Sequence, residues 1–578
     1  MAVLRGDAGG TARSGENGEV GETGRGGADG GGHEGGAEDA VLPGQPGYPA
    51  YRRAAVGAVV WAGFVAVVFA VGAALRAAGK LPVDPVPPLH ASARLLIGPL
   101  VPAAVVALAG VAVLPAAVRR LRWRPLLAVA WLASALWAVV LQWPDGVSRP
   151  LTAPTEYLAG LPAMGDHPLS WLRGFTRHLQ EYPTHVKGHP PLPDLILWIL
   201  RWTGLNEPGW AAALVIAVGT SSTVAIAMTI RTLADEETAR RALPFLVLAP
   251  TVICLATSMD AFFLGAAAWA VALTAEATAP AGEDTPHPPW GTIPLQSSSP
   301  VGVGHKAFHR LWITVLRWAG VHGRSTVRTA RDGAVDAQAP GLARKRLPAV
   351  FRPRLGRLVR ERFPAVFRPC PGGLARERLP AAFRPRQGGL ARRLVVAFVG
   401  GIVTGSLPYL NYGLVTILAL PLAVFLLTWP RRAVVVTFVL GCAVVPLAFT
   451  LGGFLWWDGV AATHAAWAAG AGSERPYAYF LVGDLAVLAL IIGPMAAGAL
   501  PYVLRRGGAL GVLTAAALLG VLALDLSGVT RGEVERIWLP YAAWLTAAAA
   551  VHRPPARRAL LVQAVTALLI QALVRSPW

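Results

Sequence analysis

Residues 54–75 read AAVGAVVWAGFVAVVFAVGAAL, an uninterrupted apolar run without a charged side chain. A helix of about 20 apolar residues is long enough to cross the hydrocarbon core of a bilayer. Similar runs recur along most of the 578-residue chain, of which 54% is hydrophobic and only 15% is charged. Soluble domains carry about 25% charged residues, so the sequence predicts an all-α, polytopic helical membrane protein.

The apolar runs and the charges between them predict about 13 transmembrane helices. The predicted spans are 54–75, 95–118, 125–143, 210–230, 242–258, 261–275, 394–410, 413–427, 433–451, 480–504, 509–524, 537–551 and 559–573. When these spans alternate, the short Lys- and Arg-rich loops at 119–124, 231–241, 429–432, 504–508 and 552–558 all fall on one face. Positive loops favour the cytoplasmic side. We therefore expect a multi-pass protein of the plasma (inner) membrane whose outer face receives 144–209, 452–479 and 525–536.

Composition divides the chain into four parts. Residues 1–52 are polar and Gly-rich and have no apolar core of a signal peptide, which predicts a disordered cytoplasmic N-terminus. Residues 53–277 form an N-terminal transmembrane module with the outer loop 144–209. Residues 278–393 form a basic cytoplasmic loop, and residues 394–578 a C-terminal transmembrane module.

The basic loop holds most of the chain's positive charge. Between Lys306 and Arg393 there are 21 Lys and Arg against four acids, a net charge of +17 out of +20 for the whole chain. Within it, LARKRLPAVFRP (342–353) recurs every 16 residues as LVRERFPAVFRP and LARERLPAAFRP. A solvated cytoplasmic insertion explains this charge, with contact to anionic lipid headgroups as the alternative; no nucleic-acid partner is expected.

Several classes of function lack their sequence signals. The three cysteines, Cys254, Cys370 and Cys442, lie far apart and show neither a disulfide framework nor metal-ligand spacing. The chain also has no glycine-rich dinucleotide motif after a strand and no P-loop. A nucleotide-driven enzyme or pump is therefore not expected.

Polar residues concentrate in the outer loop, ahead of a short apolar helix. Residues 185–207 read HVKGHPPLPDLILWILRWTGLNE, and the apolar run in this stretch is too short to cross a bilayer. Its helical spacing predicts an amphipathic helix in the membrane interface, with Trp198 and Trp202 at headgroup level and Asp194 facing solvent. Ionisable groups beside apolar helices tend to mark function.

The order of these features resembles the GT-C superfamily of membrane glycosyltransferases. The likeness lies in HPPL (189–192), the helix ending in GLNE (204–207), the small-residue span that follows, and ARRALPFLVLAPTVICLATSMDAFFLGAAAWAVAL (239–273). It covers 144–277, and GEVER (532–536) extends it loosely into the C-terminal module. The resemblance to aminoarabinose and protein mannosyl transferases implies a GT-C-like fold and a polyprenyl-phosphate-linked sugar as donor. It also implies a glycan, lipid or protein of the cell envelope as acceptor on the outer face.

The resemblance suggests which residues would act. Glu156 would be the general base that deprotonates the acceptor hydroxyl, and Asp166 would share that role or orient the acceptor. The expected substrate-binding residues are His185, Lys187, His189, Asp260, Arg475 and Arg536, with the cationic groups directed at the donor phosphate. Each has a structural alternative: Glu156 and Asp166 as loop carboxylates or helix caps, His185 to His189 as headgroup anchors, Asp260 as a helix cap, and Arg536 as the partner of Glu533 or Glu535.

Three further alternatives stay open at this point. Members of the family usually place the catalytic outer loop after the first span, and here KLPVDPVPPLH (80–90) with Asp84 occupies that place. We nevertheless expect the 144–209 loop to be catalytic, because the 80–90 segment is shorter and is not followed by the sequence pattern that resembles the GT-C family. No metal site is predicted, since Gly188 and two prolines interrupt the His185–His189 spacing, although a divalent ion stays possible. A transporter or lipid flippase, or an inactive GT-C-like scaffold, is the alternative function.

Overall fold

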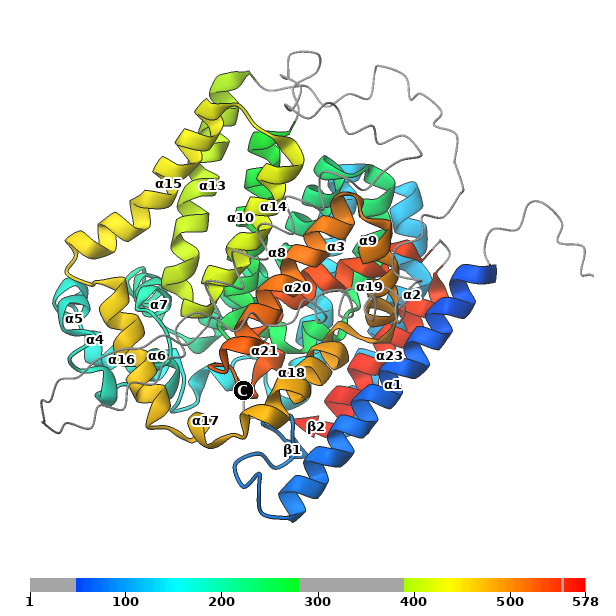
Figure 1. Ribbon diagram of the computed structural model, residues 1–578, viewed down its shortest axis with the longest axis horizontal. Helices are drawn as coiled ribbons and strands as arrows, with labels where there is room; N and C mark the ends of the chain where they lie inside the picture. Colours follow the sequence, from blue (N-terminus) through cyan, green and yellow to red (C-terminus); the bar gives the residue numbers. More distant parts are fainter. Residues whose placement is uncertain (1–47, 257, 280–388, 553–555, 577–578) are drawn as a thin grey trace, which may run out of the picture. The chain divides into compact units, whose positions relative to one another are not determined.

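The computed structural model describes residues 48–256, 258–279, 389–552 and 556–576. The expectations for residues 1–47 and for the basic repeats lie outside the described residues. Helices dominate the described chain, as the all-α prediction requires (Figure 1). Two strands of two residues each, β1 (Ser92–Ala93) and β2 (Val574–Arg575), pair antiparallel and join the first outer segment to the C-terminal one.

The N-terminal module consists of long helices interrupted by a group of short ones. The long segments are α1 (Tyr48–Ala77), α2 (Val101–Arg120), α3 (Trp123–Gln142), α8 (Pro208–Leu233), α9 (Glu236–Val247), the 3₁₀ helix η5 (Pro250–Ala256) and α10 (Asp260–Thr278). The loop between α3 and α8 contains α4 (Tyr157–Met164), α5 (Pro168–Gly174), α6 (Thr184–Lys187) and α7 (Leu192–Trp202).

Helix α7 coincides with the predicted short apolar helix, but it is rotated relative to the prediction. Its buried side carries Pro193, Asp194 and Leu197, and α7 packs on α4. Asp194 is only 1% exposed, so the prediction that it faces solvent was wrong. Burial is the main reason why the pKa of Asp194 lies well above its usual value.

The C-terminal module begins after the basic loop. Its segments are α13 (Leu390–Leu410), the 3₁₀ helix η7 (Tyr412–Leu418), α14 (Ala419–Thr428), α15 (Arg432–Leu451), α16 (Trp456–Ala468), α17 (Ala471–Glu474), α18 (Tyr477–Ile492), α19 (Pro494–Arg506), α20 (Gly508–Ser527), α21 (Val534–Ile537), α22 (Leu539–Thr546), the 3₁₀ helix η8 (Ala547–Val551) and α23 (Arg557–Leu573).

The chain is a multi-pass helical membrane protein. Among the described residues, eight helices are long and apolar enough to cross a membrane, and the bent pairs α9–η5 and α18–α19 raise the number to ten. Every predicted span coincides with a helical segment. The exact count of thirteen stays a prediction, because η7–α14, α22–η8 and α23 are shorter than the other spans.

The predicted span 480–504 is not one straight helix. Helices α18 and α19 meet at 105° around Gly493, which has φ +78°, and Pro494. Gln563 of α23 provides hydrogen bonds to backbone groups on both sides of the bend. Its side chain accepts a hydrogen bond from Met495 N–H at 3.2 Å and donates one to Ile492 C=O at 2.9 Å. A side-chain amide that replaces lost helical hydrogen bonds makes such a bend tolerable within a membrane.

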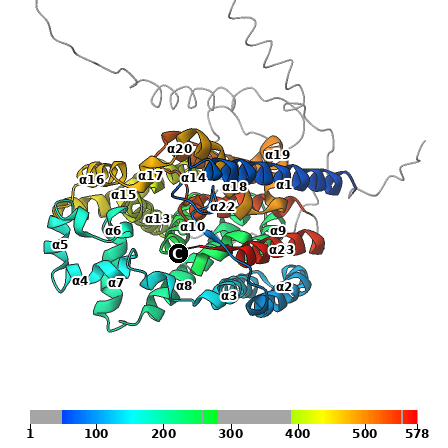
Figure 2. The same ribbon diagram turned by 90° about the horizontal axis from the view of Figure 1, so that it is seen from below.

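Helix α10 lies at the centre of the bundle and α1 at its edge. In α10, 72% of the apolar window is buried against protein, compared with 11% in α1. Helix α10 packs on α8, α13, α14 and α22, whereas α1 lies along α18 and α19 (Figure 2). The exposed apolar side chains of α1, such as Val59 and Val67, suit contact with lipid tails.

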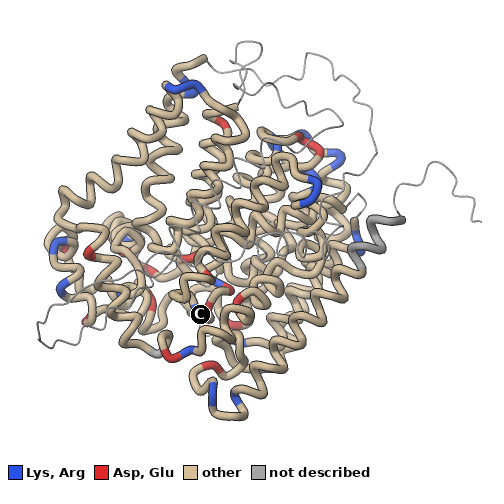
Figure 3. Tube along the Cα trace, in the orientation of Figure 1, with Lys and Arg blue, Asp and Glu red and all other residues tan. Residues whose placement is uncertain are grey.

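Lys and Arg residues gather at the upper end of the helices in Figure 3, around the ends of α9, α13 and α15. At the opposite end, the hydrogen bonds described below join the predicted outer segments 144–209, 452–479 and 525–536 and the segment 80–90. This separation is the arrangement that the positive-inside reasoning requires. It positions a group of buried charges at the end away from the basic loops.

Candidate functional site

Glu156 and His185, both predicted site residues, are in buried contact at the start of α4. Glu156 Oε1 lies 2.7 Å from His185 Nδ1, and their side chains are 2% and 5% exposed. The backbone N–H of His185 donates to Thr155 C=O at 2.9 Å, which holds α6 against the start of α4. The fold of the 144–209 loop thus brings Glu156, before α4, into contact with His185, in α6.

Arg536 connects this pair to two further predicted residues. One guanidinium nitrogen lies 3.0 Å from Asp260 Oδ2, and the other lies 3.2 Å from His185 Nε2 and 2.7 Å from Glu533 Oε2. Burial alone would lower the pKa of Arg536, but Asp260 and Glu533 raise it above its usual value. Arg536 is therefore a permanent cation shared by two carboxylates and an imidazole from three different segments.

Glu533 bridges the two buried arginines. Its Oε2 binds Arg536, and its Oε1 lies 3.3 Å from Arg475. Burial opposes ionisation, but Arg536 and Arg475 outweigh it and lower the pKa of Glu533 to about 2. Its backbone adopts φ +60°, a left-handed conformation that costs a non-glycine residue about 1–3 kcal/mol. The two ion pairs offset that strain and fix the loop before α21.

Arg475 in turn binds Asp84, the carboxylate of the shorter first outer segment. Its guanidinium approaches Asp84 with one contact of 3.0 Å and another of 2.7 Å, and Asp84 is fully buried. His90 Nδ1 lies 2.8 Å from Asp84 Oδ1. Our expectation ranked this segment below 144–209, but the structure makes both segments part of one arrangement of charges.

We call these eight residues the charge network: Asp84, His90, Glu156, His185, Asp260, Arg475, Glu533 and Arg536. Four of them are predicted substrate-binding residues and one is the predicted base. Their carboxylates and guanidinium groups are buried and paired, as ionic groups away from water must be. The network is therefore a structural element that also positions whatever polar groups border it.

The structure does not bring the remaining predicted residues into this network. Asp166 is exposed and forms no hydrogen bond or ion pair within the described part of the chain. Lys187 donates to Gln180 C=O at 3.3 Å. His189 is buried against Tyr157 and Phe263, and burial lowers its pKa to about 4, so that it is neutral at pH 7.

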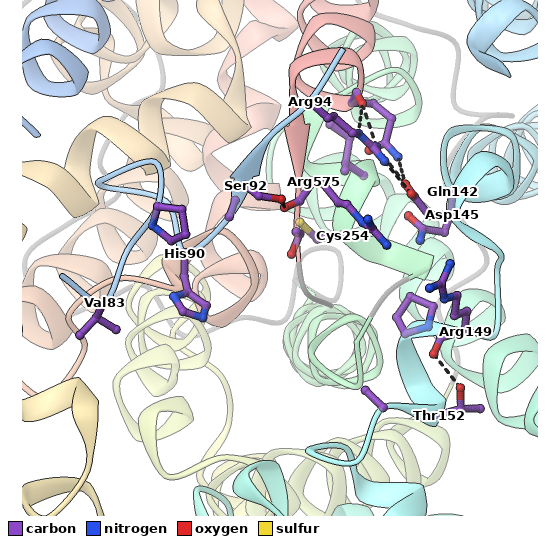
Figure 4. A pocket seen from close by; sticks show the side chains of 17 residues that line it. Val83, His90, Ser92, Arg94, Gln142, Asp145, Arg149, Thr152, Cys254 and Arg575 are labelled. Carbon is purple, nitrogen blue, oxygen red and sulfur yellow. Dashed lines mark hydrogen bonds and ion pairs between the residues drawn. The ribbon is translucent and has the colours of Figure 1, made fainter. Parts of the chain in front are cut away.

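A cavity of about 640 Å³ opens beside His90 (Figure 4). On its far wall, Arg94 binds Asp145 through two contacts of 2.6 and 2.9 Å, and Gln571 donates to the same carboxylate at 3.0 Å. Arg149 and Arg575 also line the cavity and are exposed. Neither has an ion pair within the described residues. We call this the arginine-walled cavity.

Sequence reasoning missed this cavity, because its wall comes from three separate segments. Arg94 follows β1, Arg149 follows α3, and Arg575 lies in β2. The β1–β2 pairing, with Ser92 opposite Arg575, brings the third segment to the first. Arginines in outer segments were visible in the sequence, but nothing in their spacing indicates this pairing.

Protein-family models, curated proteins and solved structures were compared with this chain, and none matches it. The site must therefore be interpreted from its own residues. Among the described residues, no three His, Cys, Asp or Glu side chains are grouped so as to hold a metal ion.

Glu535 provides a test of the energetics of this region. It is 6% exposed, neither carboxylate oxygen has a hydrogen-bond partner in the described residues, and burial raises its pKa to about 7. Because the pKa of Glu535 rises from 4.5 to about 7 on folding, ionisation of this buried group makes the folded protein less stable as the pH rises from about 4.5 to 7. We expect Glu535→Gln to be more stable than wild type by about 3 kcal/mol at pH 8, and equal to it at pH 4.5.

Thermal unfolding in detergent at pH 4.5, 6 and 8 measures this difference. The exposed Glu474 gives the matched control, because Glu474→Gln should leave the pH dependence of wild type unchanged. A Glu535→Gln protein that is less stable at pH 8 would mean that the buried carboxylate is charged and has a counter-ion.

Proposed function

We propose that this protein is a membrane glycosyltransferase with a GT-C-like fold. It transfers a sugar from a polyprenyl-phosphate donor to an acceptor of the cell envelope, on the outer face of the plasma membrane. The arginine-walled cavity carries the proposal, because it places cationic groups beside a buried acid–base network at the end of a helix bundle away from its basic loops.

The two arginines of the cavity suit a phosphate. Arg149 and Arg575 are exposed, line the same cavity, and have no carboxylate partner in the described chain. Guanidinium groups bind phosphate oxygens through charge-assisted, often bidentate hydrogen bonds. As the lipid phosphate leaves the sugar, its negative charge grows, and fixed cations stabilise that charge.

This assignment moves the donor phosphate away from the loop residues expected to hold it. His189 is neutral at pH 7, and Lys187 lines none of the described cavities. Arg475 and Arg536 are both engaged by buried carboxylates. We assign Arg475 and Arg536 to positioning the site and Arg149 and Arg575 to binding the donor.

The experiment is transfer of radiolabelled sugar from a panel of polyprenyl-phosphate sugars in membranes. We expect wild type to transfer a sugar, and Arg149→Gln and Arg575→Gln each to raise the donor KM about 10- to 100-fold, because a hydrogen bond to a charged group contributes about 1.5–3 kcal/mol. Arg177→Gln, an exposed outer-loop arginine, is the control and should keep the wild-type KM.

Unchanged KM values in both cavity variants would contradict the phosphate assignment, and absence of transfer by wild type from every donor would contradict the transferase. In the second case the transporter becomes the better candidate. Its supporting observation is that α18 buries the carboxylate of Asp484 within the apolar bundle.

A further inference from the structure

We infer that His90 is the catalytic base of the proposed transfer, and that Asp84 and Arg475 are the positioning residues that orient it. The inference rests on the proposed function. It replaces the expected carboxylate base with an imidazole–carboxylate pair in the first outer segment.

His90, Asp84 and Glu156 are the candidates for the general base, and they differ in their access to the arginine-walled cavity. His90 lines the arginine-walled cavity and its side chain is 28% exposed, whereas the side chain of Asp84 is 1% exposed and does not line the cavity. Glu156 is likewise buried and borders a narrow space of about 10 Å³. A general base must reach the proton that it removes. Within the network, His90 is the group placed to meet a substrate in that cavity (Figure 4).

The contacts of Asp84 fix the orientation of the imidazole. Asp84 Oδ1 lies 2.8 Å from His90 Nδ1 and 2.7 Å from an Arg475 nitrogen. The same Arg475 nitrogen lies 3.1 Å from His90 Nδ1. In the proposed arrangement Nδ1 carries the proton and donates it to Asp84 Oδ1, which leaves Nε2 as the basic nitrogen. A carboxylate that holds an imidazole in one tautomer also stabilises the imidazolium formed during catalysis.

The step balances without any further reactant. The oxygen of an acceptor hydroxyl forms a bond to the anomeric carbon of the sugar, and the bond from that carbon to the phosphate oxygen breaks. The electron pair of the broken bond stays on the lipid phosphate, beside Arg149 and Arg575. The hydroxyl proton moves to His90 Nε2 and then to solvent. The acceptor is therefore a hydroxyl-bearing molecule that enters the cavity from the His90 side.

Charged groups face His90 from each of the elements packed against it. On its own segment lies Asp84; Arg475 follows α17, and Glu533 and Glu535 lie before and within α21. The cavity adds Arg94, Arg149, Arg575 and Asp145. Loss of the Asp84 carboxylate removes the nearest stabiliser of the imidazolium formed during the step, so kcat rather than the donor KM should fall.

Full-length protein in nanodiscs, with the best polyprenyl-phosphate sugar from the donor panel, provides the test. We expect His90→Gln to lower kcat about 100- to 10,000-fold with the donor KM within about threefold of wild type, as loss of a general base requires. Asp84→Asn should lower kcat less, again with the donor KM within about threefold of wild type, because Asp84 acts only through the imidazole. His178→Gln removes a second imidazole that pairs with a carboxylate, Glu181, but in an exposed position; it should behave like wild type.

The outcomes separate the two proposals. Wild-type transfer that survives in His90→Gln within threefold would overturn the base assignment and leave the transferase standing. Absence of transfer by wild type would overturn the transferase itself, and the base assignment with it. If Asp84→Asn fails to fold because Arg475 loses its partner, His90→Asn with His90→Gln still decides the question, since His90 is partly exposed.

Discussion

Replacing Arg536 with methionine should remove most of the folded protein. Asp260, Glu533 and His185 share this one guanidinium, and all of them are at least three-quarters buried. Removing one partner of a buried ion pair leaves uncompensated charge and costs about 3–5 kcal/mol. This is a large part of the net stability of a folded protein. We therefore expect a strong fall in Tm and in the yield of monodisperse protein.

Size-exclusion chromatography and thermal unfolding in detergent measure both effects. Arg177→Met is the matched control, because this exposed arginine has no ion pair in the described residues. Arg536→Lys should fall between the two, since lysine keeps the charge but lacks the planar fork that reaches three partners. A Tm of Arg536→Met within 2 °C of wild type would mean that the network does not stabilise the fold.

The second large effect is expected where α13 and α15 touch. These helices lie side by side in Figure 1, and a Cβ atom added to Gly401 would lie 2.1 Å from the carbonyl oxygen of Phe438. Gly441 and Gly405 meet the opposite backbone equally closely, at 2.2 Å each. Small residues of this kind allow membrane helices to approach backbone to backbone.

We expect Gly401→Leu to destabilise the C-terminal module by about 3 kcal/mol, because the backbone of α15 must move to make room. The matched control is Gly63→Leu in α1, where an added Cβ meets nothing within 4 Å. Thermal unfolding of both variants in the same detergent measures the difference. Equal stability of the two variants would show that α13 and α15 can separate without loss.

The helices could be predicted from the sequence because apolar length is a local property. Each predicted span coincides with a helical segment, and the resemblance singled out Asp260 and Arg536, which meet in the structure. The bend at Gly493 could not be predicted, since the apolar composition continues through it and Gln563, which caps it, lies 70 residues later.

The site depended on contacts that no local pattern encodes. Asp84 was ranked second because its segment is short, yet it binds Arg475, 391 positions away. Arg575 reaches the cavity only because β2 pairs with β1. Asp194 was placed on the solvent side of α7 because a carboxylate usually avoids burial, and it is buried. The catalytic roles of Glu156 and Asp166 stay predictions.

The charges of the network are divided unequally between the two transmembrane modules. The module before the basic loop supplies Asp84, Glu156 and Asp260, whereas the module after it supplies both guanidinium groups, Arg475 and Arg536. Before the two modules dock, Asp84 and Asp260 lack their arginine partners, and Arg475 and Arg536 share the single carboxylate of Glu533. A low-dielectric interior tolerates such incompletely paired charge poorly. Each module therefore completes the charge pairing of the other, and their docking brings the carboxylates of the first to the arginines of the second.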